Sequence, residues 1–124
     1  MNNNIKKPVI IVVDDVYYFC EALKQSLKSS YEVHTFTIAQ DAVNFITKNP
    51  VDLVLLDYEM PGMTGYEVLM AIRLNRSTNK TPVIFLTGET NERMKKEMLD
   101  RGASDYLCKP INYPELHKCI KKHL

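Results

Sequence analysis

Five polar residues each stand at or just beyond the end of a short apolar run. They are Asp14, Asp15, Asp57, Thr87 and Lys109. Two like charges about 4 Å apart repel each other by about 4 kcal/mol at an effective dielectric of about 20, so three clustered carboxylates need a cation beside them. Lys109 supplies one positive charge, and carboxylate oxygens with room for water are the ligands that Mg²⁺ prefers.

Such a group of side chains is suited to phosphoryl transfer. The cation and the lysine would neutralise phosphoryl oxygens, and a carboxylate held beside them would attack phosphorus in line. The predicted product is an aspartyl phosphate. Zinc is not expected, because the histidines lie outside this group and no cysteine has the spacing of a zinc ligand. The histidines are His34, His117 and His123.

The apolar runs that precede these residues are interpreted as strands. They are short and rich in β-branched and aliphatic residues, which is typical of parallel strands covered on both faces. The predicted strands are 9–13, 31–36, 51–56, 82–86 and 103–107, of which 31–36 alternates and is expected to be more exposed. Between them, apolar residues recur at helical spacing. The stripes are Val16, Phe19, Cys20, Leu23 and Leu27; Ala42, Val43 and Ile46; Val68, Leu69 and Ile72; Met94, Met98 and Leu99; and Leu116, Cys119 and Ile120.

Five strand-helix units predict an α/β fold for residues 1–124 as a single domain. The expected architecture is a five-stranded parallel sheet in the flavodoxin-like order 2-1-3-4-5, with helices on both faces. Ligands of such a sheet bind beyond the carboxyl ends of the strands, where the winding direction reverses. Taken singly, an aspartate after a strand is most often a helix cap or turn former, and a lysine is usually a surface charge. Because these residues occur together at four strand ends, a functional site is favoured over separate caps and surface charges.

With these residues in place, the chain resembles a response-regulator receiver domain, the phosphoacceptor module of two-component signalling, and is similar to chemotaxis regulators. The resemblance runs from about Pro8 to His123. It rests on four motifs in order: the acidic pair Asp14-Asp15, the segment from Asp57 to Gly65 (DYEMPGMTG), Thr87-Gly88, and the segment from Gly102 to Pro110 (GASDYLCKP).

The resemblance implies a role for each matching residue. Asp57 matches the phosphoacceptor; Asp15 and Asp57 would ligate Mg²⁺ directly, and Asp14 would act mainly through water. The third protein ligand would be the backbone carbonyl of Glu59, whose side chain stays free to affect the site. Lys109 would contact the phosphoryl group.

Further positions match the part of the family that transmits the signal. Thr87 and Tyr106 match the switch pair, in which the hydroxyl turns toward the phosphoryl group and the ring packs inward behind it. The face formed by the fourth helix, fifth strand and fifth helix would then change partners. Glu59, Gly88 and Glu89 are expected to modulate the lifetime of the phosphoryl group, and the bond into Pro110 is typically cis in this family.

Some positions depart from the usual pattern. Met94 and Met98 stand on the fourth helix where smaller residues are common, so its output face is expected to be unusual. Tyr17 and Tyr18 lie opposite the apolar stripe of the first helix. They are read either as amphipathic surface tyrosines or as a docking contact for the phosphodonor.

Other functions were weighed on the same residues. A haloacid-dehalogenase-like phosphohydrolase also forms an aspartyl phosphate, but it needs its nucleophile on the first strand and an aspartate two residues later, where this chain has Glu59. A flavodoxin-type FMN carrier is rejected because Asp14-Asp15 would repel the phosphate. A degenerate receiver that takes no phosphate remains an alternative.

Composition and partners complete the expectations. A net charge of +1 gives no general attraction to nucleic acid. No run is long enough for a membrane span, and Cys20, Cys108 and Cys119 look like apolar fillers in a reducing compartment, so a cytoplasmic location is expected. The partners would be a histidine kinase or histidine phosphotransfer protein, then an effector protein or attached output domain, with a phosphorylation-dependent dimer as an option. The chain is not expected to be an enzyme beyond catalysing its own phosphorylation and dephosphorylation.

Overall fold

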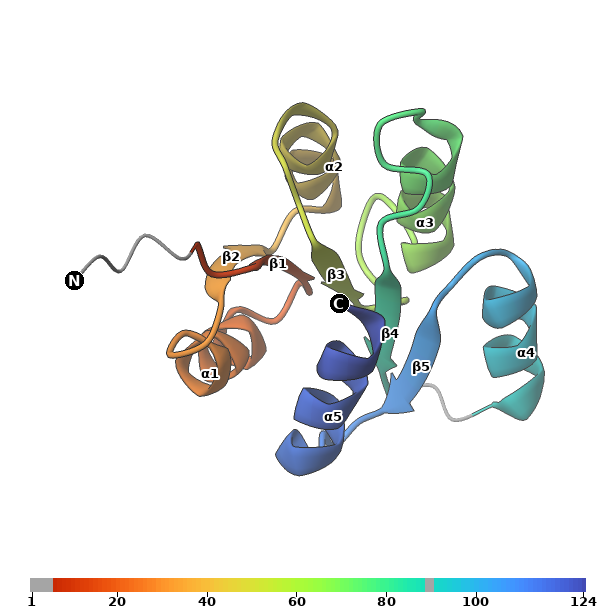
Figure 1. Ribbon diagram of the computed structural model, residues 1–124. Helices are drawn as coiled ribbons and strands as arrows, with labels where there is room; N and C mark the ends of the chain where they lie inside the picture. Colours follow the sequence, from red (N-terminus) through yellow and green to blue (C-terminus); the bar gives the residue numbers. More distant parts are fainter. Residues whose placement is uncertain (1–5, 89–90) are drawn as a thin grey trace.

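The computed structural model describes residues 6–88 and 91–124, in which five strands alternate with five helices (Figure 1). The strands are β1 (Val9–Val13), β2 (Glu32–Phe36), β3 (Leu53–Leu56), β4 (Val83–Thr87) and β5 (Asp105–Cys108). The helices are α1 (Tyr17–Leu27), α2 (Ala39–Lys48), α3 (Gly65–Leu74), α4 (Glu92–Asp100) and α5 (Tyr113–His123).

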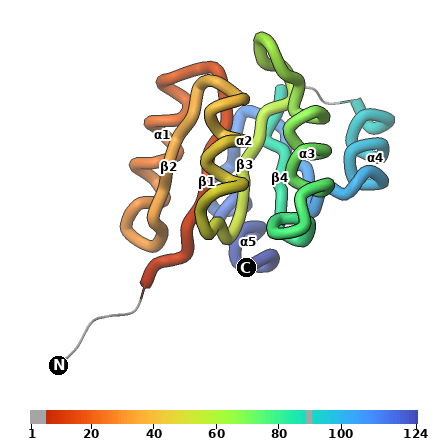
Figure 2. The backbone as a smooth tube through the Cα atoms, turned by 90° about the horizontal axis from the view of Figure 1, so that it is seen from above, coloured from red at the N-terminus to blue at the C-terminus, as the bar shows by residue number. Residues whose placement is uncertain are grey.

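The strands form one parallel sheet in the order β2-β1-β3-β4-β5, which confirms the predicted topology. Alternate residues of β1 point to opposite faces of the sheet. Ile11 and Val13 pack with α2, α3 and α4, whereas Ile10 and Val12 pack with α1 and α5. Figure 2 shows α2, α3 and α4 following one another across one face. The buried strands therefore read as continuous apolar runs, because both of their faces are covered.

Local signals set where several helices begin. Thr64 caps α3 in a reciprocal capping box with Glu67, and Asn91 caps α4. Asn112 caps α5, whose first turn contains a proline as its sequence predicts. These caps fix the helix starts at the same edge of the sheet as the polar residues that follow the strands.

Two positions assigned to apolar helical stripes lie elsewhere in the structure. Val16 was placed in the apolar stripe of the first helix, but it occupies the N-cap position of α1 and is 51% exposed. Leu99 is 37% exposed, because only a narrow stripe of α4, centred on Met98, faces the core. Thr78, in the loop between α3 and β4, is buried and donates its hydroxyl hydrogen to the Ile72 carbonyl at 2.7 Å.

Candidate functional site

The carboxyl ends of β1, β3, β4 and β5 bring the predicted polar residues to one edge of the sheet. Backbone hydrogen bonds continue one residue beyond the strands and keep these residues abreast: the amide of Asp57 donates to Val13, and the amide of Lys109 donates to Thr87, both at 2.9 Å. The order of the strands thus places Asp14 and Lys109 side by side, although they are 95 positions apart in the sequence.

Three carboxylates and one ammonium form the centre of this acidic crevice. Asp14, Asp15 and Asp57 each offer an oxygen within 4.8 Å of the others, and Asp14 and Asp57 are buried while Asp15 is exposed. The Nζ atom of Lys109 lies 2.6 Å from Asp14 Oδ2 and 3.7 Å from Asp57 Oδ2. The ammonium therefore neutralises Asp14 more closely than Asp57.

An aromatic ring positions the ammonium. Lys109 Nζ stands 4.2 Å from the centroid of the Phe19 ring, within the range of a cation–π contact. Phe19 belongs to the apolar stripe of α1 and packs against the core. The helical spacing of Phe19 predicts a packing role alone, and no spacing signal in the chain links it to Lys109.

The environment of Asp57 disfavours its ionised form. Burial raises the pKa of this carboxyl, and the neighbouring Asp14 charge raises it further. Lys109 and hydrogen bonds from the Tyr58 amide and the Thr87 hydroxyl act in the opposite direction but do not cancel the increase. Asp57 is thus a buried carboxylate whose negative charge is incompletely balanced by the protein itself.

Thr87 and Tyr106 are already turned inward. Thr87 is 1% exposed and donates to Asp57, and the Tyr106 ring is 3% exposed with its centroid 6.0 Å from that of Phe85. The resemblance implied that the ring packs inward when the site is phosphorylated. In this structure the ring is buried against Phe85 and the apolar core beneath α4.

The remaining site residues lie around the crevice. Glu59 and Gly88 are exposed, in the loops that follow β3 and β4. Glu89 lies outside the described residues. The bond between Lys109 and Pro110 is cis.

The donor set of the crevice fits a hard divalent cation. Carboxylate oxygens converge there, one of them exposed to solvent, and the single ammonium leaves excess negative charge. Oxygen ligands of this kind suit Mg²⁺. Asp15 and Asp57 would hold such an ion, with Asp14 beside them.

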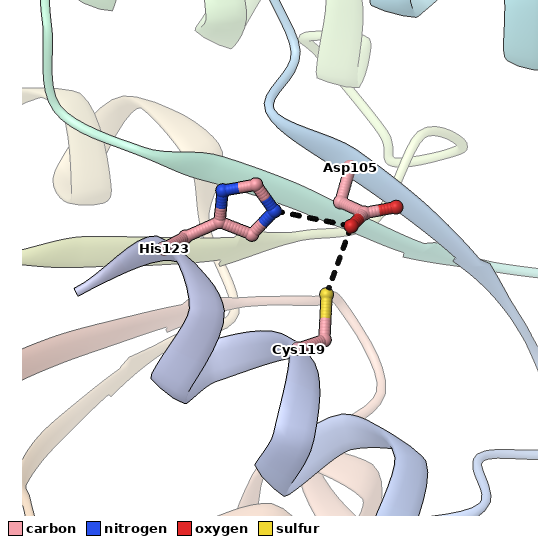
Figure 3. Close-up of side chains that lie close together, drawn as sticks. All are labelled: Asp105, Cys119 and His123. Carbon is pink, nitrogen blue, oxygen red and sulfur yellow. Dashed lines mark hydrogen bonds and ion pairs between the residues drawn. The ribbon is translucent and has the colours of Figure 1, made fainter.

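The structure also brings together a second group that the sequence analysis missed. Asp105, Cys119 and His123 meet between β5 and α5 (Figure 3). The available signal was the spacing of Cys119 and His123, four residues apart on a predicted helix. The expectation that all cysteines are buried fillers holds for Cys20 and Cys119 but not for Cys108, which is exposed.

The fold and the acidic crevice place this chain in a structural class, the α/β domains with carboxylates at the switch point of a parallel sheet. Similarity to known proteins then identifies the family. Residues 10–121 match the profile of the response regulator receiver domain. The chain therefore belongs to this family. Asp57 follows β3 and not β1, so the placement required by the phosphohydrolase alternative is not met.

Individual relatives agree with this assignment. The chain is 36% identical over 121 residues to a probable cyclic di-GMP phosphodiesterase of Vibrio cholerae serotype O1, covering 98% of this chain and 27% of that protein. It is 34% identical over 108 residues to the transcriptional regulatory protein PcoR of Escherichia coli, covering 86% and 47%. The chain thus spans less than half the length of these two relatives.

Among solved structures, the chain is similar to the chemotaxis protein CheY4 of Vibrio cholerae. The TM-score is 0.89 at 31% identity, and the match covers 95% of this chain and 99% of that one. Within residues 6–88 and 91–124, none of the helices has the length and apolar character needed to cross a membrane.

Proposed function

We propose that this receiver domain is a phosphorylation-controlled switch that accepts a phosphoryl group on Asp57. The observation that carries the proposal is the pairing of a buried, incompletely neutralised carboxylate with Lys109, whose Nζ lies 3.7 Å away. A histidine kinase or histidine phosphotransfer protein is the proposed phosphodonor. An effector protein or an attached output domain is the proposed receiver of the signal.

The chain's own residues would act in the following way. Asp57 attacks phosphorus through a carboxylate oxygen as the bond from phosphorus to the imidazole nitrogen of the donor histidine breaks, and the imidazole leaves with the bonding electrons. The Lys109 ammonium and the Thr87 hydroxyl donate hydrogen bonds to phosphoryl oxygens during this transfer. Bound Mg²⁺ would supply further positive charge to the phosphoryl oxygens. Asp14 holds Lys109 in place through the contact of 2.6 Å. Each of these groups is positioned before the donor arrives, so little reorganisation is needed.

The proposed output depends on stabilising the inward positions of Thr87 and Tyr106, which the fold accommodates. Phosphoryl oxygens would give Thr87 and Lys109 new hydrogen-bond acceptors, and a ligand shifts an equilibrium only through such differential contacts. Because Tyr106 is buried behind Thr87, we expect phosphorylation to hold this inward arrangement and so fix the face of α4, β5 and α5.

Phosphorylation is tested by incubating the chain with acetyl phosphate and measuring its intact mass, with Mg²⁺ or with EDTA. We expect a single phosphoryl adduct that forms only with Mg²⁺ and is absent from Asp57→Asn. Asp41→Asn is the matched control, because Asp41 is an exposed aspartate in the first turn of α2, outside the crevice.

Two results would contradict the proposal. An adduct that survives Asp57→Asn would place the phosphoryl group elsewhere. A chain that stays unmodified with acetyl phosphate and with every histidine kinase of its source organism would support the degenerate receiver instead.

A further inference from the structure

A second cluster of side chains lies away from the acidic crevice, between the first residue of β5 and the last turns of α5. Asp105 Oδ2 is 3.2 Å from Cys119 Sγ and 3.1 Å from His123 Nε2 (Figure 3). Cys119 and His123 are four residues apart on α5, so they share one face of the helix. One donor atom from each of the three residues lies within 4.8 Å of the other two.

We propose that Asp105, Cys119 and His123 form a binding site for a zinc-class divalent cation. A thiolate, an imidazole and a carboxylate are the three ligand types that zinc takes from proteins, and a hard ion such as Mg²⁺ has little affinity for the first two. The site is chemically distinct from the all-oxygen crevice, and phosphorylation of Asp57 plays no part in it.

The spacing of the donor atoms fits tetrahedral coordination. With bonds of about 2.3 Å to sulfur and about 2.0 Å to nitrogen and oxygen, the edges of a tetrahedron are about 3.5 Å between sulfur and oxygen and about 3.3 Å between nitrogen and oxygen. The observed separations are 3.2 Å and 3.1 Å. For these two pairs, a metal would need the ligand atoms to move apart by only a few tenths of an ångström, and the sulfur and nitrogen atoms lie within 4.8 Å of each other.

The surroundings leave room for a fourth ligand. Asp105 and Cys119 line a cavity of about 580 Å³ that is open to solvent, so water can complete the coordination sphere. His123 is the last residue of α5, where the helix dipole favours a positive charge. Three lysines also line the cavity, together with Glu115: Lys118 and Lys122 are exposed, which lets their ammonium groups extend into solvent, and Lys95 on α4 is half-buried.

The alternative is that the three side chains are only a hydrogen-bonded link between α5 and β5. Both readings use the same contacts, but they differ in what happens when metal is added. If the three side chains form only a hydrogen-bonded link, added cation should not bind to them. If they are metal ligands, they should bind one ion per chain, and the bound ion should stabilise the folded chain.

Cobalt(II) provides the direct test, because a thiolate ligand gives it a charge-transfer absorption that oxygen ligands cannot. The reduced chain is titrated with Co²⁺ in excess Mg²⁺, which occupies the crevice, and Zn²⁺ is then added in competition. We expect charge-transfer and tetrahedral ligand-field bands that saturate at one Co²⁺ per chain and disappear when Zn²⁺ is added. We also expect Zn²⁺ to raise the thermal unfolding midpoint.

Substitutions then assign the ligands. Cys119→Ser should abolish the charge-transfer band, and His123→Gln and Asp105→Asn should each weaken Zn²⁺ binding by at least about tenfold. Cys108→Ser and Cys20→Ala are the matched controls, one for an exposed thiol and one for a buried thiol beside the crevice. Asp57→Asn should bind Zn²⁺ like the unmodified chain, which keeps this test independent of the proposed phosphorylation.

The proposal is overturned if the unmodified chain shows no charge-transfer band, if the band survives Cys119→Ser, or if Cys108→Ser removes it. Should Cys119→Ser fail to fold by circular dichroism, His123→Gln decides. This residue ends α5 with its side chain partly exposed, so its replacement leaves the core intact. Unchanged Zn²⁺ affinity in that variant would reduce the cluster to a hydrogen-bonded link.

Discussion

The position of Lys109 leaves Asp57 the less closely neutralised of the two buried carboxylates, which supports its proposed role as the phosphoacceptor. The ammonium lies 2.6 Å from Asp14 and 3.7 Å from Asp57, so it neutralises mainly Asp14, the more deeply buried carboxylate. Asp57 has hydrogen bonds and the more distant share of the Lys109 charge, which do not offset its burial and the neighbouring Asp14 charge, so its pKa is raised. A cation that neutralises the ionised Asp57 carboxylate, or a phosphoryl group bonded to it, would therefore stabilise this buried position.

The charge on Asp57 is therefore predicted to reduce the stability of the fold. A carboxyl whose pKa is raised on folding costs free energy when it is ionised, and the cost disappears as the pH falls through the folded pKa. We expect Asp57→Asn to raise the free energy of unfolding in EDTA at neutral pH, with the gain vanishing in acid. Urea denaturation at several pH values measures this difference. A variant that is no more stable at neutral pH than the unmodified chain would refute the prediction, and Asp41→Asn serves as the control.

The three cysteines are predicted to react at different rates. Burial raises the pKa of Cys20 to about 11 and that of Cys119 to about 12, and only a thiolate attacks an alkylating or disulfide reagent readily. Cys108 is exposed. In the absence of metal, a native-state titration with a thiol reagent should give one fast equivalent, and denatured chain should give three. Fast reaction that persists in Cys108→Ser would contradict this order.

Residue patterns predicted the crevice but not its supporting contacts. Asp14, Asp57 and Lys109 follow strands whose order is fixed by topology, so their meeting can be inferred before any side chain is placed. The contact between Lys109 and Phe19 depends on how α1 packs, which no local pattern encodes. The cluster at Asp105 was missed for the same reason. It depends on how α5 packs against β5 and on the side-chain conformations that bring Cys119 and His123 to Asp105.

At the scale of elements, one glycine holds the loop after β3 close to the helix that follows. Gly65 begins α3, and its amide donates to the Tyr58 carbonyl at 2.7 Å. A Cβ atom at this position would collide with the backbone oxygen of Asp57 and with the Phe85 ring. The glycine is needed here for close approach, and it lets α3 start directly against the backbone of Asp57.

Gly65→Ala is predicted to destabilise the fold by about 1–3 kcal/mol, the usual cost of forcing an added methyl group into packed surroundings. Gly88→Ala is the matched control, because a Cβ there meets nothing within 4 Å. Urea denaturation of both variants measures the difference. Equal stability of the two variants would show that the β3–α3 loop adjusts freely and that its close packing is not required.

Sequence patterns located every element of the described chain but not every boundary. Strands covered on both faces have no alternation that marks their ends, so the predicted strand 51–56 begins only at Leu53 in the structure, and 103–107 is shifted to Asp105–Cys108. The amide of Ala103 bonds to Met98 at 2.9 Å and still belongs to the turn after α4. Side-chain caps mark the starts of α3, α4 and α5, whereas α1 and α2 begin without one, and Val16 at the start of α1 was assigned to the wrong position.

At the scale of the whole molecule, the fold concentrates negative charge at one edge of a sheet whose central strands, β1, β3 and β4, are apolar and buried. The chain from β1 passes to α1 on one face and the chain from β3 passes to α3 on the other, so a crevice opens between these central strands. The apolar core must hold Asp14 and Asp57 together against their repulsion. Stability and chemistry are thus coupled through the same carboxylates.

A cation that relieves this repulsion should stabilise the entire domain. Binding to the folded state alone adds RT ln(1 + [L]/Kd), which is about 2.7 kcal/mol when Mg²⁺ is present at about 100 times its Kd. We expect Mg²⁺ to raise the free energy of unfolding in a saturable way. Asp15→Asn should lose most of this gain while folding normally, because Asp15 is exposed and contributes a ligand but no core contact. Asp41→Asn should retain the full gain, and urea denaturation at constant ionic strength separates binding from general screening of charge. If NaCl of equal ionic strength stabilised the chain as much as Mg²⁺ does, or if Asp15→Asn kept the full response, the crevice would not be the site at which the ion acts.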